Sequence, residues 1–383
     1  MSHINIRKKA EIIVLPIIGA LMLAYPMLGN ADFFATAGVA YSDDDNIFRQ
    51  ETGEISDNIT TISLGLGAEW LLGKHSLSAQ YDGQFAYYDK NSNEDYKDHS
   101  LGADLFLDLT PKFKLDLQAN ADRGHEDRGS AGVASGVSSV PNETEEDRLF
   151  AGLSYGRRSA KAQVELDLEA RDLRYTNNNE QDRDRDIDTV AGRIFFNLAA
   201  KTSLFIEALN RDIDYLNPGS RNRDSTERNY SLGIDWEATR KTTGRIKIGR
   251  LEKDFESASE TDDDFRSVDA NVVWEPQTYS QVTFGASRQA SETSTTDSFI
   301  TGSLVYADWE HGFNQRLRFN ANIREGKDDY SGTREDDLSS IRLGLKYRFG
   351  IVDVGVSYAY SERKSNEADA SFEDNIYMLS FSI

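Results

Sequence analysis

Residues suited to nucleophilic or acid–base catalysis are few in this sequence. The chain of 383 residues contains five histidines and no cysteine. His99 lies on a predicted strand and is followed by Ser100, which places a base beside a hydroxyl group. A catalytic triad also needs an acid that holds the base within hydrogen-bond reach of the nucleophile, and the spacing of the other residues supports none. The sequence therefore predicts that the protein is not an enzyme and that it holds no cofactor.

Aspartates form three runs that could attract a cation. They are Asp43–Asp45, Asp262–Asp264 and the alternating run Asp182–Asp188. An EF-hand calcium loop beginning at Asp182 would need glycine at its sixth position and glutamate at its twelfth. Ile187 and Arg193 stand there instead. We therefore predict solvated acidic loops and no dedicated metal site, with weak binding of divalent cations left open.

The stretch Tyr230–Gly249 shows the framework that carries these residues. Apolar residues occupy every second position up to Trp236, a polar connection follows, and the alternation resumes through Ile246 and Ile248. A period of two is typical of a strand with one apolar and one polar face. A short polar link between two such runs predicts a β-hairpin.

This hairpin unit recurs along the whole chain. Its first strand ends in a bulky apolar residue before a short polar turn, and all four tryptophans hold that place. A soluble propeller has four short strands in each repeat of roughly 40 to 50 residues. Each unit here has two runs of about ten residues, the length of a tilted strand that crosses a bilayer. We predict a periplasmic aromatic girdle formed by Trp70, Tyr155, Trp236, Trp274, Trp309 and Tyr347.

The predicted fold class is all-β: a transmembrane antiparallel up-and-down β-barrel of about 18 strands. It would have short periplasmic turns and long acidic extracellular loops, of which Gly124–Asp147 is the longest. The mean hydropathy of −0.58 suits a wide barrel, because only alternate strand residues face lipid. All six prolines fall outside the predicted strands, as backbone pairing requires. These strands cover residues 33–41, 59–70, 76–88, 99–109, 113–122, 148–156, 161–173, 188–198, 203–213, 228–238, 244–253, 266–274, 280–290, 299–309, 316–325, 339–348, 351–360 and 375–383.

The two ends of the chain predict export to the outer membrane. Basic residues Arg7–Lys9 precede an apolar run that two prolines interrupt, and small residues precede Asp32. Residues 1–31 are therefore predicted to be a cleaved signal peptide, and 32–383 to be an outer-membrane β-barrel. At the other end, alternation continues to Ile383, as in the terminal signal that barrel-assembly machinery reads.

The polar faces of the predicted strands carry charge of opposite sign on opposite walls. This arrangement would create a transverse field across a water-filled pore. An equally weighted alternative is a wall that its charges keep solvated, each charge paired with a neighbour. The acidic pore-lining residues would be Asp104, Asp108, Asp116, Glu165, Asp167 and Glu169. The basic pore-lining residues would be Arg318, Arg324, Arg342 and Lys346.

Two segments resemble the putative beta-barrel porin 2 family. Ala40–Arg49, with the sequence AYSDDDNIFR, is similar to the opening signature of that family, and Tyr81–Leu115 is similar to its next hairpins. The resemblance extends over essentially the whole mature chain. It implies an outer-membrane barrel that is often encoded with exopolysaccharide or capsule export machinery.

We therefore expect a porin-like conduit for export of an exopolysaccharide or capsular polysaccharide. The alternatives are a general diffusion porin for small polar solutes and a non-conducting scaffold for surface polysaccharide assembly. The expected partners are outer-membrane lipid and lipopolysaccharide, barrel-assembly machinery during folding, the polysaccharide and a separate periplasmic export protein, but no nucleic acid. The periplasmic protein is expected because a barrel that begins at Asp32 leaves no domain to bridge the periplasm.

Overall fold

Eighteen strands account for almost all of the regular structure. The computed structural model describes residues 31–130, 140–157, 160–218, 221–237, 241–293 and 297–383. Two short 3₁₀ turns, η3 (Ser92–Glu94) and η4 (Gln181–Arg183), lie between strands, and no helix in the described ranges is long and apolar enough to span a bilayer. The strands are β1 (Ala31–Asp44), β2 (Asp57–Leu72), β3 (His75–Tyr88), β4 (Tyr96–Thr110), β5 (Phe113–His125), β6 (Glu143–Tyr155), β7 (Ala162–Tyr175), β8 (Arg185–Ala199), β9 (Thr202–Tyr215), β10 (Ser225–Trp236), β11 (Thr242–Phe255), β12 (Asp263–Gln277), β13 (Ser280–Ser291), β14 (Ile300–Gly312), β15 (Leu317–Tyr330), β16 (Glu335–Phe349), β17 (Val352–Ser365) and β18 (Phe372–Ser382).

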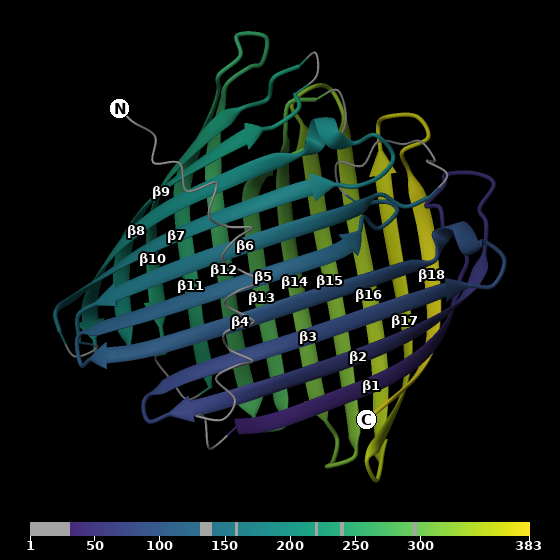
Figure 1. Cartoon of the computed structure of the whole chain (residues 1–383), viewed down its shortest axis with the longest axis horizontal. Helices are drawn as coiled ribbons and strands as arrows, with labels where there is room; N and C mark the ends of the chain where they lie inside the picture. The colour runs from purple at the N-terminus through teal and green to yellow at the C-terminus, as the bar shows by residue number, and fades with distance from the viewer. Residues whose placement is uncertain (1–30, 131–139, 158–159, 219–220, 238–240, 294–296) are drawn as a thin grey trace.

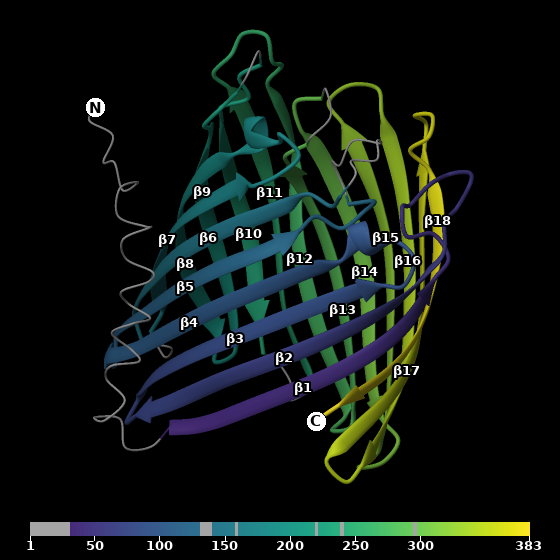
Figure 2. The ribbon, with the colours of Figure 1, turned by 45° about the vertical axis from the view of Figure 1, so that its right-hand side comes forward.

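Each strand pairs antiparallel with its neighbours in the sequence, and the last strand returns to the first. The β1–β18 ladder runs from Gly38↔Ser382 to Asp44↔Ile376 and closes the ring (Figures 1 and 2). Closure leaves no edge strand with unpaired backbone groups. The predicted fold, a closed antiparallel barrel of 18 strands, is confirmed.

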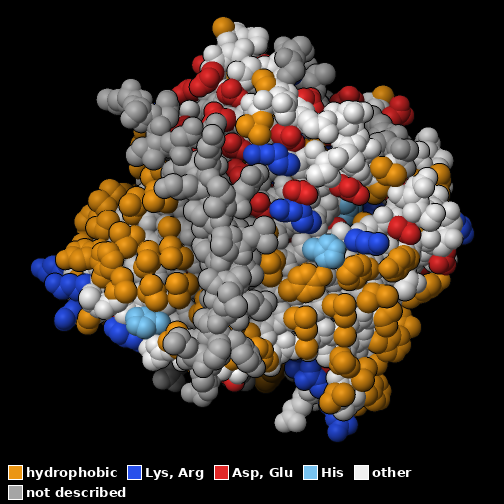
Figure 3. Space-filling view, in the orientation of Figure 1, with side chains coloured by type: hydrophobic (Ala, Val, Ile, Leu, Met, Phe, Trp, Pro, Cys, Tyr) orange, Lys and Arg blue, Asp and Glu red, His pale blue; other side chains and the backbone are white. Residues whose placement is uncertain are grey.

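Alternation assigns the two faces of the wall. On β10 and β11, the apolar residues Leu232 and Ile248 are 62% and 56% exposed and directly opposite each other. The residues that alternate with the apolar ones along each strand belong to the other face. Lys247, which precedes Ile248, lies on that face and forms an ion pair with Glu207 of β9. We call the face with the exposed apolar residues outward and the other face inward. Figure 3 shows the outward apolar side chains as a band, with acidic side chains gathered above it.

The two ends of the ring differ in their connections. At one end, tight turns join the strands, such as residues 73–74 and 350–351, where Gly73 and Gly350 take positive φ angles of 69° and 61°. Tight hairpin turns need this conformation, which glycine adopts without strain. At the other end, connections such as residues 45–56 and 126–142 are longer. We call these the short-turn end and the long-loop end.

Most differences from the predicted strands lie at the long-loop end. Polar residues there continue the backbone ladders beyond the apolar band, so that Glu143–Asp147, expected in the longest loop, forms the start of β6. For the same reason β15 extends to Tyr330 and β16 begins at Glu335. The connection 331–334 is therefore as short as some turns at the short-turn end, such as residues 313–316. Pro276 was expected in a turn but lies within β12, at a register shift between Trp274 and Gln277. A bulge tolerates proline because its backbone nitrogen is not needed in the ladder.

The predicted signal peptide lies outside the described residues, except for Ala31, which begins β1. The predicted girdle residues all lie towards the short-turn end and on the outward alternation. Trp274 and Trp309 are 44% and 40% exposed, whereas Trp70 is 8% exposed and packs edge-on against Phe33. Their role at a membrane interface stays a prediction.

Candidate pore wall and mouth

The inward face of β4 and β5 carries the first part of the predicted acidic set. Asp104 accepts a hydrogen bond from Ser78 (3.3 Å), and Asp116 accepts one from Gln118 (3.4 Å). Asp108 lies 3.4 Å from the ammonium group of Lys74 at the short-turn end. Of these three carboxylates, Asp108 alone has an ion pair among the described residues.

The inward acidic residues of β7 are partly neutralised by arginines. The guanidinium group of Arg193, on β8, donates hydrogen bonds to Glu165 at 2.8 Å, to Glu207 at 2.7 Å and to Asp167. Arg148, on β6, pairs with Glu169 at 2.5 Å. The alternative of paired wall charges therefore describes this part of the wall. Arg193 was overlooked as a wall residue in the sequence, although it stands on the inward alternation of a predicted strand.

The inward basic residues of β15 and β16 lie elsewhere on the ring, since β15 is nine strands from β6. Arg318 and Lys346 are directly opposite partners, Arg342 faces Asn322, and the guanidinium carbon of Arg324 lies 5.8 Å from the centre of the Tyr306 ring. Among the described residues, none of these four cations forms an ion pair. The basic wall therefore has fewer ion pairs than the acidic residues of β7, although Asp353 of β17 lies near enough to interact with the charges of Lys346 and Arg318.

The β5–β6 connection crosses part of the opening at the long-loop end. Arg128 pairs with Glu94 of η3 (2.8 Å), and Arg363 of β17 donates hydrogen bonds to the carbonyl groups of Gly129 and Ser130. Around the ring, β1 to β4 separate β5 from β17 and β18, so these contacts place residues 128–130 across the mouth. A Cβ atom on Gly129, whose φ is 77°, would lie 2.9 Å from Arg49 and 3.0 Å from Phe372.

A second network ties the same loop to the β7–β8 connection. Glu126 accepts hydrogen bonds from Arg183 (2.6 and 2.9 Å), Tyr175 (2.8 Å) and Asn142 (2.9 Å). Burial alone would raise the pKa of Glu126, but the hydrogen bonds and the charge of Arg183 outweigh it and hold that pKa below its ordinary value. Ionised Glu126 is therefore a fixed part of the mouth.

A third network lies under the connections of β9 to β14. Lys253 has no exposed surface and contacts Glu227 at 3.0 Å and Glu292 at 2.7 Å. The hydroxyl of Tyr215 donates to Glu292 at 2.6 Å. Burial opposes the ionisation of Glu292, yet the charge of Lys253 holds the pKa of Glu292 below its ordinary value. The Tyr215–Glu292 contact joins residues 77 positions apart, which alternation within single strands does not reveal.

Aspartates of the acidic loops close hairpins. Asp184 and Asp224 accept the backbone N–H groups of Tyr175 and Tyr215, the last residues of the preceding strands, at 2.7 and 2.6 Å. In both hairpins the preceding arginine lies over the same tyrosine ring, as in Arg183 over Tyr175 at 4.1 Å. These loop aspartates, predicted to be solvated, therefore have a structural role.

The cluster Asp44, Asp45 and Asp374 brings carboxylate oxygens within 4.8 Å of one another. The guanidinium group of Arg49 lies 3.2 Å from Asp44 and 2.9 Å from Asp374, so an arginine already supplies positive charge there.

The four histidines in the described part of the chain lie apart from each other in polar and aromatic surroundings. His125, which falls in the predicted long loop Gly124–Asp147, ends β5, where its ring lies 3.0 Å from Asp98 and stacks on Tyr96. His99 lies on the outward alternation and shares a hydrogen bond of 2.8 Å with the hydroxyl of Tyr81.

Comparisons with known proteins agree with this architecture. No curated protein matches the chain significantly. Among solved structures, OccK2 (OpdF) of Pseudomonas aeruginosa is 9% identical with a TM-score of 0.50, over 93% of this chain and 98% of that chain. OpdO of the same organism is 13% identical with a TM-score of 0.50, over 92% and 97%. OccK2 in complex with glucuronate is 10% identical with a TM-score of 0.50, over 93% and 98%. At these identities the likeness shows the fold.

A family model described as putative beta-barrel porin 2 matches residues 33–383, in agreement with the resemblance seen in the sequence. The protein is an integral outer-membrane β-barrel of the porin type, with its long-loop end extracellular and its short-turn end periplasmic. The chain belongs to the putative beta-barrel porin 2 family.

Proposed function

We propose that the barrel is a passive diffusion pore for small polar solutes and that it favours anions. The observation that carries this proposal is a set of four inward cations that form no ion pair among the described residues: Arg318, Arg324, Arg342 and Lys346. Arginine binds carboxylate and phosphate groups through two parallel hydrogen bonds. A line of such groups along one wall offers successive weak sites to an anionic solute.

Screening limits how far this charge acts. Eighteen strands close at a diameter of roughly 35 Å, and the Debye length is about 8 Å at physiological ionic strength. A solute would therefore sense the basic residues only near β15 and β16. The opposing field is weaker than the sequence suggests, because Arg193 and Arg148 partly neutralise the inward acidic residues of β7.

The mouth supports small solutes more than a polymer. Residues 128–130 lie across part of the extracellular opening and narrow the entrance. OccK2, which has the same fold, was crystallised with glucuronate, a sugar that bears a carboxylate. A ligand of that chemical class suits the basic wall proposed here.

Ion selectivity in planar bilayers tests the proposal. In a salt gradient, we expect the wild-type reversal potential to indicate anion preference. The variant R318Q/R324Q/R342Q/K346Q should shift towards cations, more strongly at low salt, and D104N/D108N/D116N should shift the opposite way. K97Q, which changes an outward cation of β4, is the control. If the fourfold variant conducts with an unchanged reversal potential, the proposed basic pathway is wrong, and a wild-type barrel that does not conduct would favour the scaffold function.

Export of an exopolysaccharide or capsular polysaccharide remains the prediction that the family resemblance implies. It requires a periplasmic partner, which crosslinkers placed at Lys74 or Lys241, at the short-turn end, should capture. A barrel that is fully active in cells lacking any such partner would leave diffusion as the better account.

A further inference from the structure

Two arginines on the outward face of the wall are directly opposite each other. Arg250 of β11 and Arg266 of β12 are register partners. They share the alternation of Ile248, the outward apolar residue that precedes Arg250 by two positions. Like charges in direct cross-strand pairs repel, and the next outward row, Glu252↔Asp264, supplies two carboxylates beside the arginines.

The row that contains these arginines lies immediately above the apolar band. One row lower, Leu232, Ile248 and Val268 are register partners across β10 to β12. In the arginine row, Arg250 also faces Tyr230, whose side chain is 58% exposed. Tyrosine and arginine next to an apolar belt are typical of the level at which lipid headgroups lie.

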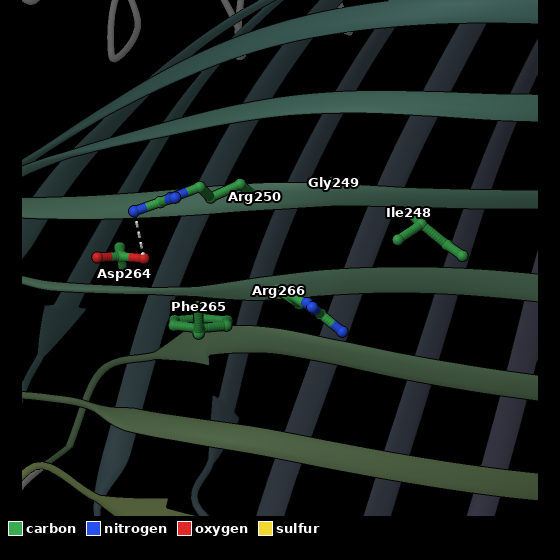
Figure 4. Close-up of a pocket in the computed structure, with 6 residues that line it drawn as sticks. All are labelled: Ile248, Gly249, Arg250, Asp264, Phe265 and Arg266. Atoms are coloured by element: carbon green, nitrogen blue, oxygen red, sulfur yellow. Dashed lines mark ion pairs between the residues drawn. The ribbon is translucent and has the colours of Figure 1, made fainter.

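The carboxylates nearby neutralise only part of this charge. Arg250, with a side chain 64% exposed, contacts Asp264 at 2.8 Å and Glu252 at 3.8 Å. Arg266 is exposed and forms no ion pair within the described parts of the chain. Figure 4 shows the guanidinium group of Arg250 turned towards Asp264 and that of Arg266 turned the other way along the wall.

The seam between β12 and β13 opens beside these arginines. The β12–β13 ladder stops at Val268↔Arg288, although both strands continue beyond that pair. The guanidinium carbon of Arg288 lies 5.6 Å from the centre of the Phe265 ring on β12. The open hollow beside this seam, about 470 Å³, is lined by Ile248, Gly249, Arg250, Asp264, Phe265 and Arg266.

We propose that Arg250 and Arg266 bind a phosphate group of an outer-leaflet lipopolysaccharide headgroup. The two exposed side chains would turn from the directions seen in Figure 4 towards a phosphate between them, which would relieve their repulsion and accept paired hydrogen bonds from each. The acyl chains of the same lipid would lie on Leu232, Ile248 and Val268, and Tyr230 would border the headgroup. The outward position at lipid depth identifies a lipid as the source of the phosphate, since a free anion would gain nothing from the apolar row.

Native mass spectrometry of the detergent-purified, full-length barrel tests this site. The probes are diphosphorylated lipid A and the same lipid after chemical removal of its phosphates. We expect R250Q/R266Q to bind the diphosphorylated lipid about thirtyfold more weakly than wild type, which corresponds to about 1 kcal/mol for each arginine. The matched control is R123Q/R228Q, because Arg123 and Arg228 are outward arginines that have carboxylate partners, Asp147 and Asp254.

Only folded species are scored, so loss of folding cannot imitate loss of the site. Wild type and R123Q/R228Q should retain the diphosphorylated lipid and bind the dephosphorylated one weakly. The proposal is overturned if both double variants bind alike, or if wild type binds the two lipids equally. Displacement of the lipid by an equal concentration of inorganic phosphate would also overturn it, because the site would then be one for a free anion.

Discussion

Glu292 lies 2.7 Å from the ammonium group of Lys253, although the lysine side chain has no exposed surface. Glu292 belongs to the connection between β13 and β14, whereas Lys253 is on β11. Glu227 of β10 supplies the second carboxylate, 3.0 Å away. The pair therefore holds an extracellular loop against the inner wall through a charge that water does not reach.

Replacing Lys253 with methionine should destabilise the barrel strongly. The change would leave buried Glu292 without its ion-pair partner and Glu227 with Arg211 alone, which lowers the free energy of unfolding by about 3 to 5 kcal/mol. Urea titration of the folded barrel in lipid vesicles, followed by tryptophan fluorescence, measures this loss. K364M is the control, because Lys364 pairs with Glu362 while 69% exposed, and such pairs contribute about 1 kcal/mol or less. Equal stability of the two variants would contradict the prediction.

The mouth should loosen in acid through Glu126. Its pKa in the folded protein lies below the ordinary value of 4.5, so the stabilisation it gives is complete above the unfolded pKa. That stabilisation is lost as the pH falls through the folded pKa. Hydrogen-exchange protection factors around residues 126–130 should therefore fall, and limited proteolysis there should accelerate, as the pH drops below the ordinary value of 4.5. In E126Q the loop should be labile already at pH 7, and a wild-type-like acid transition in that variant would exclude Glu126 as the cause.

Removing the carboxylates that close two hairpins should have a local effect. D184A leaves the backbone N–H group of Tyr175 without its acceptor, and D224A does the same for Tyr215. Each loss should lower the local stability of the strand end by about 1 kcal/mol. The amide protons of Tyr175 and Tyr215 should exchange about fivefold faster in the corresponding variant. D182A is the control, since exposed Asp182 lies in the same acidic run. Similar exchange in all three variants would show that the hydrogen bonds do not protect the strand ends.

The four tryptophans should report one depth in the bilayer. They lie on the outward alternation towards the short-turn end, where an interfacial girdle is expected. In four single-tryptophan barrels with phenylalanine at the other three positions, lipids brominated at two depths should place Trp70, Trp236, Trp274 and Trp309 at the same level. A tryptophan quenched only by a water-soluble quencher would remove that residue from the girdle.

The strands and the orientation of their faces could be predicted from the sequence because alternation is a local property. The residues from Asp104 to Lys346 assigned to one face do lie on the inward alternation, since each strand has a long apolar stripe that fixes its register. The partners of these residues were not accessible in the same way. Arg193 contacts Glu165, Asp167 and Glu207 because of the relative stagger of three strands. Tyr215 contacts Glu292 only because the loop that carries Glu292 folds inwards. Such contacts depend on where each strand stops, which the polar residues at the long-loop end obscured.

The ladder between β1 and β18 has a consequence for how the chain acquires its structure. Every other ladder joins neighbours in the sequence, so hairpins can form one after another with short closing loops. The pairing of Val39 with Phe381 instead joins nearly the two ends of the described chain. For a flexible chain, the entropy lost on closing a loop grows with the logarithm of its length, so this seam carries the largest such penalty in the barrel. We therefore expect closure of β1 against β18 to be the last and slowest step of folding, and the same seam to open first under force.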